Sequence, residues 1–315
     1  MQRMVINRIL IGFATLMVVS ILVFIGTSVL PGDVAEIVLG QSATPESLAA
    51  FRAERGLDKP LPMQYLHWLG GMMTGDLGTS KAGGASISSL IGGRLGNTMF
   101  LAAIVALISV PLSVGLGLLA AMHPGTWIDR VLTFGTMSLI SVPEFFIATF
   151  MVLILAVELQ WLPAIAHISP EDDWLKQLRG LAMPLITLII VVAAQMIRMT
   201  RAGILNVMNS PYIEMAILKG VPRTRIILRH AFFNAIGPIV NVVALNLAYL
   251  VSGVVIVETI FAYPGLAKLM IDGVQTRDLP LVQATGMIFC GVYVVLIILA
   301  DVAAILSNPR LRNPK

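Results

Sequence analysis

Several stretches of this chain are long, apolar and nearly free of charge, and this feature restricts the possible folds most severely. The first runs from Ile9 to Leu30, 22 residues without a charged side chain. An α-helix of that length rises about 33 Å, enough to cross the hydrocarbon core of a bilayer. Because backbone groups in hydrocarbon need partners within their own segment, we expect each stretch to be a helix. A transmembrane β-barrel is excluded, since runs such as Val18–Ile25 do not alternate between apolar and polar residues.

Six stretches of this kind occur, and they predict an all-α integral membrane protein with six transmembrane helices. None contains more than one charged residue. Composition agrees, because charged residues make up only 12% of the 315 positions, against about 25% in soluble domains. The predicted spans are Ile9–Leu30, Met99–Ala121, Val131–Val157, Leu181–Ile197, Ala235–Val257 and Leu281–Leu306.

The basic residues of the connections predict how these spans are oriented. Lys and Arg concentrate in cytoplasmic loops, and here they gather near both ends of the chain and in residues 198–234. We therefore expect both termini to be cytoplasmic. The connections expected on the cytoplasmic side are 122–130 and 198–234, and those expected on the external side are 31–98, 158–180 and 258–280.

The external connection 31–98 is too long for a simple link between neighbouring helices. Its sequence predicts a helix over Pro45–Arg55, capped by Thr44 and ended by Gly56. Loops of this size often carry binding function, so the segment either docks an external partner or covers the helix bundle. The chain is accordingly divided into a first helix with its external loop (1–98), a five-helix core (99–306) and a cytoplasmic tail (307–315).

The cytoplasmic connection 198–234 predicts a short helix, Pro211–Lys219. Ser210 suits its N-cap, Pro its first position, and Gly220 the C′ position after its end. So short a helix is not stable alone in water, so it must contact a lipid surface, the helix bundle or a cytoplasmic partner. The basic residues that follow are equally suited to an anionic lipid surface: Arg223, Arg225 and Arg229.

A few charged and amide side chains in or beside the predicted spans are candidates for a solute pathway. Glu144 follows Pro143 in the third span, and an intramembrane carboxylate is a functional candidate by default. It either faces the pathway or is a buried group that is neutral or paired with another helix. Arg198 and Arg201 lie at the cytoplasmic end of the fourth span, where they serve either as charge anchors or in function. The amides that either line the pathway or hydrogen-bond between helices are Gln195, Asn241 and Asn246.

The segment Tyr212–Gly220 resembles the cytoplasmic EAA…G loop of ABC-importer permeases. Met215 stands where that family has the first Ala of the triplet, and Gly96 and Asn308 also depart from the family pattern. The loop after the first span resembles that of B-type subunits in the dipeptide and oligopeptide branch. The motifs that carry this resemblance extend almost from end to end: Pro31-Gly32-Asp33, Ala43-Thr44-Pro45-Glu46, Gly56-Leu57-Asp58, Gly75-Asp76-Leu77-Gly78-Thr79-Ser80, Arg229-His230-Ala231, Glu258-Thr259, Pro264-Gly265, Arg277-Asp278 and Pro309-Arg310.

The resemblance implies a type I ABC-importer permease of the bacterial or archaeal cytoplasmic membrane, with no catalytic residue, metal site or cofactor of its own. A C-type permease would form the other half of the pathway, and two cytoplasmic ATPases would bind ATP and Mg. An extracytoplasmic solute-binding protein would deliver dipeptides, oligopeptides or similar small solutes; no nucleic-acid partner is implied. The residues that the resemblance assigns to ATPase coupling are Tyr212, Glu214, Met215, Ala216, Lys219 and Gly220.

Two other classes of membrane protein fit this sequence less well. An intramembrane enzyme would need a catalytic motif, and the chain contains no G-x-x-x-x-G-K-[ST], G-x-S-x-G or H-E-x-x-H pattern. A secondary transporter coupled to ions or protons would need ionisable groups within the membrane, and the spans hold chiefly Glu144 and the terminal Asp301. A secondary transporter is the main alternative, because it too would have several spans.

Overall fold

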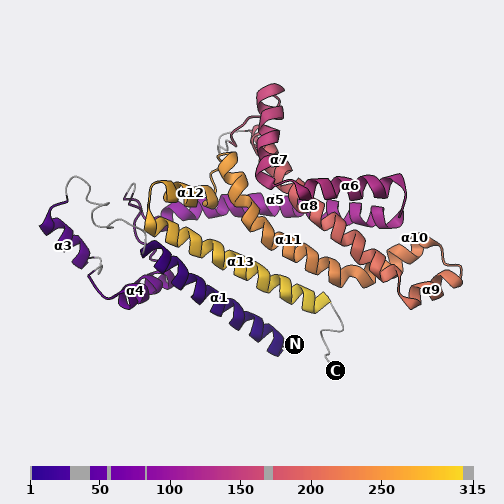
Figure 1. Cartoon of the computed structure of the whole chain (residues 1–315), viewed down its shortest axis with the longest axis horizontal. Helices are drawn as coiled ribbons and strands as arrows, with labels where there is room; N and C mark the ends of the chain where they lie inside the picture. Colours follow the sequence, from indigo (N-terminus) through magenta and orange to yellow (C-terminus); the bar gives the residue numbers. More distant parts are fainter. Residues whose placement is uncertain (1, 29–42, 55–57, 82–83, 167–172, 308–315) are drawn as a thin grey trace.

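The computed structural model describes residues 2–28, 43–54, 58–81, 84–166 and 173–307, and its long helices extend along an elongated molecule (Figure 1). Five helical stretches of this described part are long and apolar enough to cross a membrane. They contain α1 (Gln2–Ser28), α5 (Ile87–Met122), α8 (Trp174–Met208), α11 (Phe232–Ile260) and α13 (Leu279–Ser307). The shorter elements are α3 (Pro45–Glu54), α4 (Leu61–Thr74), α6 (Trp127–Ser141), α7 (Glu144–Met151), α9 (Pro211–Leu218), α10 (Arg223–Arg225) and α12 (Leu266–Gln275), with π-helical turns η2 (Val152–Glu158) and η3 (Ile226–Ala231).

The prediction of an all-helical membrane fold is confirmed, but several helices extend beyond their apolar stretches. Helix α5 begins at Ile87 rather than Met99, and α8 begins at Trp174 rather than Leu181. Polar residues in these added turns are satisfied by neighbours; the Asn97 amide, for example, donates to the Pro264 carbonyl at 2.8 Å. Hydropathy therefore locates a helix well but sets its ends too close together.

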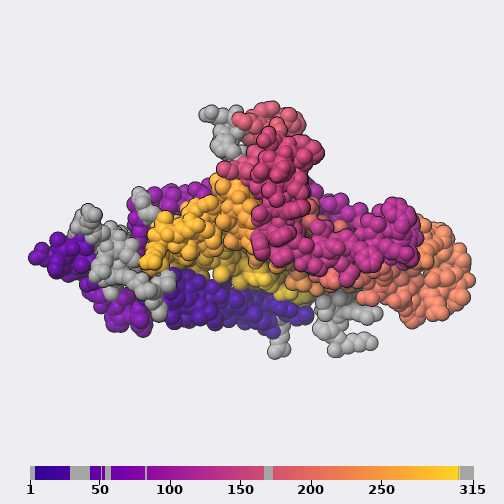
Figure 2. Space-filling model, turned by 45° about the horizontal axis from the view of Figure 1, so that its top comes forward, coloured from indigo at the N-terminus to yellow at the C-terminus, as the bar shows by residue number. Residues whose placement is uncertain are grey.

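The predicted third span, Val131–Val157, is present as a bent pair of helices and not as one continuous helix. It consists of α6 and of α7 continued by η2, and the two parts meet at an angle of 99°. Pro143 lacks an N–H group and disfavours helical backbone in the residue before it, so Val142 is extended, with φ −96° and ψ 127°. The α7 segment consequently projects from the body of the molecule (Figure 2), and six spans are reached only if this bent pair counts as one.

Helices α1 and α13 form an antiparallel pair that is held at both ends. Near one end the Arg8 guanidinium lies 3.2 Å from the Asp301 carboxylate, and near the other the Gln283 amide donates to the Thr27 hydroxyl at 2.5 Å. Between them a Cβ on Gly12 would lie 2.8 Å from Ile298, so the absent side chain allows the close approach. The opposite face of α1 exposes large apolar side chains, as expected for a helix in contact with lipid or another membrane protein: Ile9, Leu10, Phe13 and Leu22.

Helices α5, α8 and α11 enclose the main apolar core, and α5 and α8 are in close contact at Gly117. A Cβ at this position would lie 2.7 Å from Cβ of Thr200 and 2.9 Å from the Ile197 carbonyl oxygen. Small residues at helix contacts commonly allow such packing in membranes. Because one of these neighbours is a backbone atom, rotation of a side chain could not make room for a Cβ at this position. Glycine therefore allows this close contact between α5 and α8.

A buried carboxylate, Glu258, organises the connection from α11 to α12. Its Oε2 accepts hydrogen bonds from the N–H groups of Ala267 at 2.8 Å and Lys268 at 3.2 Å, in the first turn of α12. Its Oε1 accepts from the Thr98 hydroxyl of α5 at 2.5 Å. A Cβ on Gly265 would collide with this carboxylate, so the turn requires glycine there. Glu258 thus satisfies the start of one helix while linking two others.

Asp278 makes the corresponding connection between α13 and the Gly75–Ser80 motif of the predicted external segment. Its Oδ1 accepts from the Leu281 N–H at 3.3 Å, as an N-cap residue does. Its Oδ2 accepts from the Ser80 hydroxyl at 2.5 Å and from the Lys81 N–H at 2.9 Å. This part of the segment is therefore built into the helix bundle.

The predicted helix over Pro45–Arg55 is present as α3, and the Thr44 hydroxyl caps it by accepting from the Ser47 N–H at 3.2 Å. Its predicted end at Arg55 and Gly56 lies outside the described residues, as does the tail from residue 308. Helices α3 and α4 lie at the opposite end of the molecule from α9 and α10 (Figure 1). The two connections singled out in the sequence are thus well separated in space.

Glycine at position 117 is expected to be essential for the α5–α8 contact, whereas Gly115 on the same helix faces open space. Gly117→Ala should lower the thermal midpoint of the purified protein in detergent, because overpacking costs about 1–3 kcal/mol. Gly115→Ala should leave the midpoint unchanged or raise it slightly, since alanine favours helix. Equal midpoints for the two variants would contradict the packing described here.

Candidate functional site

Helix α9 lies in the connection between α8 and α10, where the sequence predicts a short helix. It begins at Pro211 and ends at Leu218, with Lys219 as the capping residue, so the predicted boundaries hold to within one residue. The prediction for Ser210 is wrong in one respect: its hydroxyl does not cap α9 but donates to the Val207 carbonyl at the end of α8. The short connection between the two helices is thereby tied to α8.

The C-terminal end of α9 is a Schellman motif. The Gly220 N–H donates to the Ile217 carbonyl at 2.9 Å, and the Val221 N–H donates to the Ala216 carbonyl at 3.1 Å. Gly220 adopts φ +71°, as predicted for the C′ position, and no neighbour lies within 4 Å of an ideal Cβ there. Glycine is therefore required at this position by backbone conformation and not by lack of space.

The two faces of α9 differ sharply in burial. Ile213 is completely buried in an apolar cluster that contains Ile204 of α8, Ala121 of α5 and Ile227 of η3. The sequence predicts one apolar patch on this helix, formed by Tyr212, Ile213, Ala216 and Ile217. In the structure Ala216 is half-buried beside Ile213, but Tyr212 and Ile217 are each about half exposed. The exposed side chains also include Met215 and Leu218, the latter 75% exposed.

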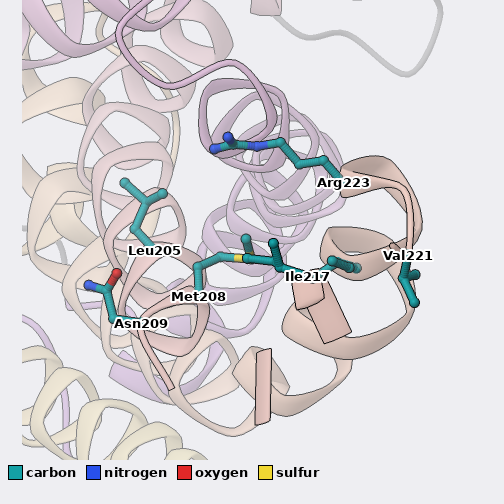
Figure 3. A pocket seen from close by; sticks show the side chains of 7 residues that line it. Leu205, Met208, Asn209, Ile217, Val221 and Arg223 are labelled. Carbon is teal, nitrogen blue, oxygen red and sulfur yellow. The ribbon is translucent and has the colours of Figure 1, made fainter. Parts of the chain in front are cut away.

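A pocket of about 470 Å³ opens between α9 and the end of α8 (Figure 3). Leu205, Met208 and Asn209 line it from α8, while Ile217 and Arg223 approach from the other side (Figure 3). Five of the seven residues that line it are apolar, and the polar ones are Asn209, directly after α8, and Arg223 at the start of α10. This pocket and the exposed residues of α9 form one continuous outward surface, because Ile217 belongs to both.

The two arginines at the cytoplasmic end of the fourth predicted span have different surroundings. Arg201 is partly buried and paired with Asp129 of α6, with Nε 2.5 Å from Oδ1. Arg198 is exposed, and its Nη2 lies 3.4 Å from the Gln195 amide oxygen. Sequence reasoning missed Asp129, because its partner is 72 positions away and nothing local marks the pair.

Glu144 lies in the first turn of α7, directly after the bend. One of its carboxylate oxygens, Oε2, is buried and has no hydrogen-bond partner in the described part of the chain. A Cβ on Gly253 of α11 would be 3.0 Å from this oxygen, so the carboxylate points toward the α11 backbone. A negative charge at this place is favoured by the helix dipole but not by any donor. The alternative in which the Glu144 carboxylate is paired with a group on another helix is therefore not supported at Oε2.

The other predicted pathway residues are not joined to Glu144 by any hydrogen bond within the described ranges. The Asn246 amide donates to the Val242 carbonyl of its own helix at 2.8 Å, and Gln195 contacts Arg198 on the same helix. Asn241 is exposed. The described residues also contain no group of three or more His, Cys, Asp or Glu side chains that could hold a metal ion.

Comparison with known families matches nearly the whole chain. Residues 1–107 match the N-terminal region of binding-protein-dependent transport system membrane components, and residues 113–313 match the family described as binding-protein-dependent transport system inner membrane component. The two matches together include every predicted span except for residues 108–112, which lie within the second.

Individual relatives are similar over the same extent. The chain is 33% identical over 309 residues to the probable peptide ABC transporter permease protein y4tP of Sinorhizobium fredii, covering 98% of each chain. It is 34% identical over 317 residues to a putative peptide transport system permease protein of Brucella abortus, covering 99% of each. It is also 33% identical over 312 residues to the glutathione transport system permease protein GsiC of Escherichia coli, again covering 99% of each.

Burial of Ile213 is expected to hold α9 against the bundle. Ile213→Ala should weaken this contact by about 2–5 kcal/mol and so increase the population in which α9 is detached. Trypsin cleavage of the purified protein after Lys219 should then accelerate at least about tenfold, since cleavage follows the open population. Leu218→Ala removes an exposed side chain of the same helix and should leave the rate unchanged. Similar rates for both variants would show that Ile213 is not the anchor.

Proposed function

Because this chain belongs to the family of binding-protein-dependent transport system inner membrane components, we propose that it forms half of the pathway of an ATP-driven importer for small peptides. It is an integral protein of the bacterial inner membrane. The observation that carries the proposal is the near end-to-end similarity to relatives named as peptide and glutathione transport permeases. Dipeptides, oligopeptides or similarly small solutes are therefore the proposed substrates.

Other subunits would supply the energy and the first recognition of the solute. A second, C-type permease would complete the pathway, two cytoplasmic ATPases would bind and hydrolyse ATP with Mg, and an external binding protein would deliver the solute. The absence of a nucleotide-binding pattern from the sequence supports this division of roles. This chain would then be a permease and not an enzyme.

Helix α9 is the proposed contact for one ATPase. Its exposed apolar side chains offer a docking surface, and Ile213 and the Schellman motif fix that surface relative to the bundle. Tyr212 and Met215 would contact the ATPase, Glu214 and Lys219 would complement the helix dipole at its two ends, and Ala216 and Gly220 would maintain the packing and the cap. ATPase closure would move α9 and change the balance between inward-open and outward-open states.

The α9–α10 end of the molecule is proposed to be cytoplasmic, together with both termini. The separation of α9 and α10 from α3 and α4 supports this orientation (Figure 1), as do the basic residues near α9 and at the chain ends. The binding protein would approach the region of residues 31–98 at the other end. Residues 99–306 would then form the permease core and 307–315 a cytoplasmic tail.

Reconstitution of the complete transporter into vesicles tests both the function and the role of α9. The wild-type complex should take up peptide only when the binding protein and hydrolysable ATP are present. Gly220→Val should lower this uptake about tenfold, because a β-branched residue at φ +71° is strained by about 1–2 kcal/mol. Gly220→Asn should retain most uptake, since asparagine tolerates this conformation.

This experiment tests the importer function and the role of the α9 cap independently of each other. Wild-type uptake driven by an ion gradient without ATP would replace the importer with the secondary transporter considered above. ATP-driven uptake that is the same in the Val and Asn variants would retain the importer and remove the cap of α9 from the coupling mechanism.

Glu144 is proposed to face the pathway and to favour solutes with a positively charged amino group. Its buried oxygen has no hydrogen-bond partner among the described residues, so a charged donor on the solute would be attracted strongly in this environment. Glu144→Gln keeps the size of the side chain and removes the charge. Uptake of cationic peptides should fall about tenfold more than uptake of neutral ones, equivalent to about 1.4 kcal/mol.

Competition uptake with cationic, neutral and acidic peptides measures this preference, normalised to the amount of transporter in the membrane. Glu158→Gln is the matched control, because Glu158 is exposed at the far end of the same bent segment. An unchanged order of preference in Glu144→Gln, or an equal loss for all peptides, would remove Glu144 from solute selection.

A further inference from the structure

The Asp129 carboxylate is the most completely paired charged group in the cytoplasmic half of the described structure. Its Oδ1 and Oδ2 accept from Nε and Nη2 of Arg201 at 2.5 and 2.9 Å, a two-point contact. Oδ2 also accepts from the Gly125 N–H at 2.9 Å, and Oδ1 lies 3.4 Å from the Thr133 hydroxyl. Asp129 is only 4% exposed, while the side chain of Arg201 is 28% exposed, so the carboxylate is the buried partner of the pair.

The pair connects the beginning of α6 with α8. Asp129 lies in the first turn of α6 and reaches back to Gly125 in the preceding turn, so it fixes the start of the helix as well as binding α8. Within the described residues, the side-chain hydrogen bonds between α6 and another long helix all involve Asp129. The orientation of α6 relative to α8 consequently depends on this carboxylate.

Packing alone holds α6 less firmly. Trp127, Val131 and Phe134 are each at least 60% exposed, so much of the apolar surface of α6 is not covered by the chain. Beneath the helix, a small cavity of about 20 Å³ remains between Leu132 and Thr136 of α6 and Ile197 of α8. Such a loosely filled contact would allow α6 to slide along α8. The two-point ion pair opposes this movement because its geometry is fixed.

Helix α8 in turn is firmly connected to α9. Helix α8 ends at Met208, only seven positions after Arg201, which corresponds to a rise of about 10 Å. Ile204 of α8 and Ile213 of α9 share one buried cluster, and the Ser210 hydroxyl is bonded to the α8 terminus. A displacement of α9 therefore displaces this end of α8 and, through Arg201, the start of α6.

The far end of α6 is the bend that carries Glu144. Helix α6 has 15 residues and so extends about 22 Å from Asp129's turn to the extended Val142. The bend contains Pro143, which leaves α6 and α7 without a continuous hydrogen-bonded backbone. Motion of the start of α6 would thus change the position of Glu144 relative to Gly253 of α11.

We propose that Asp129 and Arg201 are positioning residues that make α6 move together with α8, so that displacement of α9 reaches the bend that carries Glu144. The inference rests on the proposed function, in which a partner ATPase moves α9. It adds a specific route between the docking helix and the pathway, formed by one ion pair and one rigid helix.

The complete transporter, reconstituted with its ATPases and binding protein, provides the test. Asp129→Asn keeps the shape of the side chain and its ability to accept from Gly125 but removes the charge that binds Arg201. ATP hydrolysis stimulated by the binding protein should stay within about twofold of wild type, while peptide uptake per ATP hydrolysed should fall about tenfold. Arg201→Gln should have the same effect, and the double variant should be no worse than either single variant, since the pair acts as a unit.

Arg130→Gln is the matched control, because Arg130 is an exposed arginine next to Asp129 on α6. It should leave the ratio of uptake to hydrolysis unchanged. A ratio unchanged in Asp129→Asn, or lowered equally in Arg130→Gln, would overturn the proposal. Loss of ATP-driven uptake in the wild-type complex would instead overturn the proposed function and this inference with it.

A distance measurement tests the motion directly, and its arm with the ion pair intact does not depend on the folding of an Asp129 variant. Spin labels are attached at Val131→Cys of α6 and Met199→Cys of α8, both exposed positions, after Cys290→Ser. The distance between the labels should stay constant when ATP is bound and hydrolysed with Asp129 present, and should change with ATP in the Asp129→Asn background. A distance that already changes with the ion pair intact would show that α6 does not follow α8.

Discussion

Buried carboxylates at the starts of helices hold this membrane protein together. The carboxylates that are buried in the described residues belong to Asp129, Glu258 and Asp278. Each accepts a backbone N–H next to the start of a helix and also binds a group from a distant segment. The physical reason is that the first N–H groups of a helix lack partners within it, and inside a bundle in lipid they find little water. One carboxylate thus accepts hydrogen bonds from the start of a helix and also holds a distant segment against that helix.

Glu144 differs from these three carboxylates. It lies in the first turn of a helix, yet its buried Oε2 has no partner in the described residues and faces a glycine. A buried polar atom without a partner costs free energy, so its retention needs another reason. Selection of a positively charged solute gives such a reason, and the bend at Pro143 brings this residue to a place where helix motion can alter its surroundings. The structural carboxylates and the proposed functional one are therefore distinguished by their hydrogen bonds.

The docking surface of α9 combines weak intrinsic stability with firm attachment. Eight residues do not form a stable helix alone, and this one depends on Ile213, on the Schellman motif and on the bond from Ser210 to α8. These contacts leave its other apolar side chains available on the surface. A short helix attached in this way transmits displacement as a unit, which is what coupling between an ATPase and a transport pathway requires.

The sequence alone determined the features that depend on neighbouring residues. Charge-free stretches predicted the membrane helices, Pro211 and Gly220 predicted both ends of α9, and Thr44 predicted the start of α3, because hydropathy, capping and backbone preference are local properties. Tertiary structure decided which side chains of α9 face outward and which groups the buried carboxylates bind. Those outcomes depend on residues far apart in the chain, such as Asp129 and Arg201 or Glu258 and Thr98. Their pairing is fixed only when the helices pack, because each group is satisfied by whichever partner the packing brings within hydrogen-bonding distance.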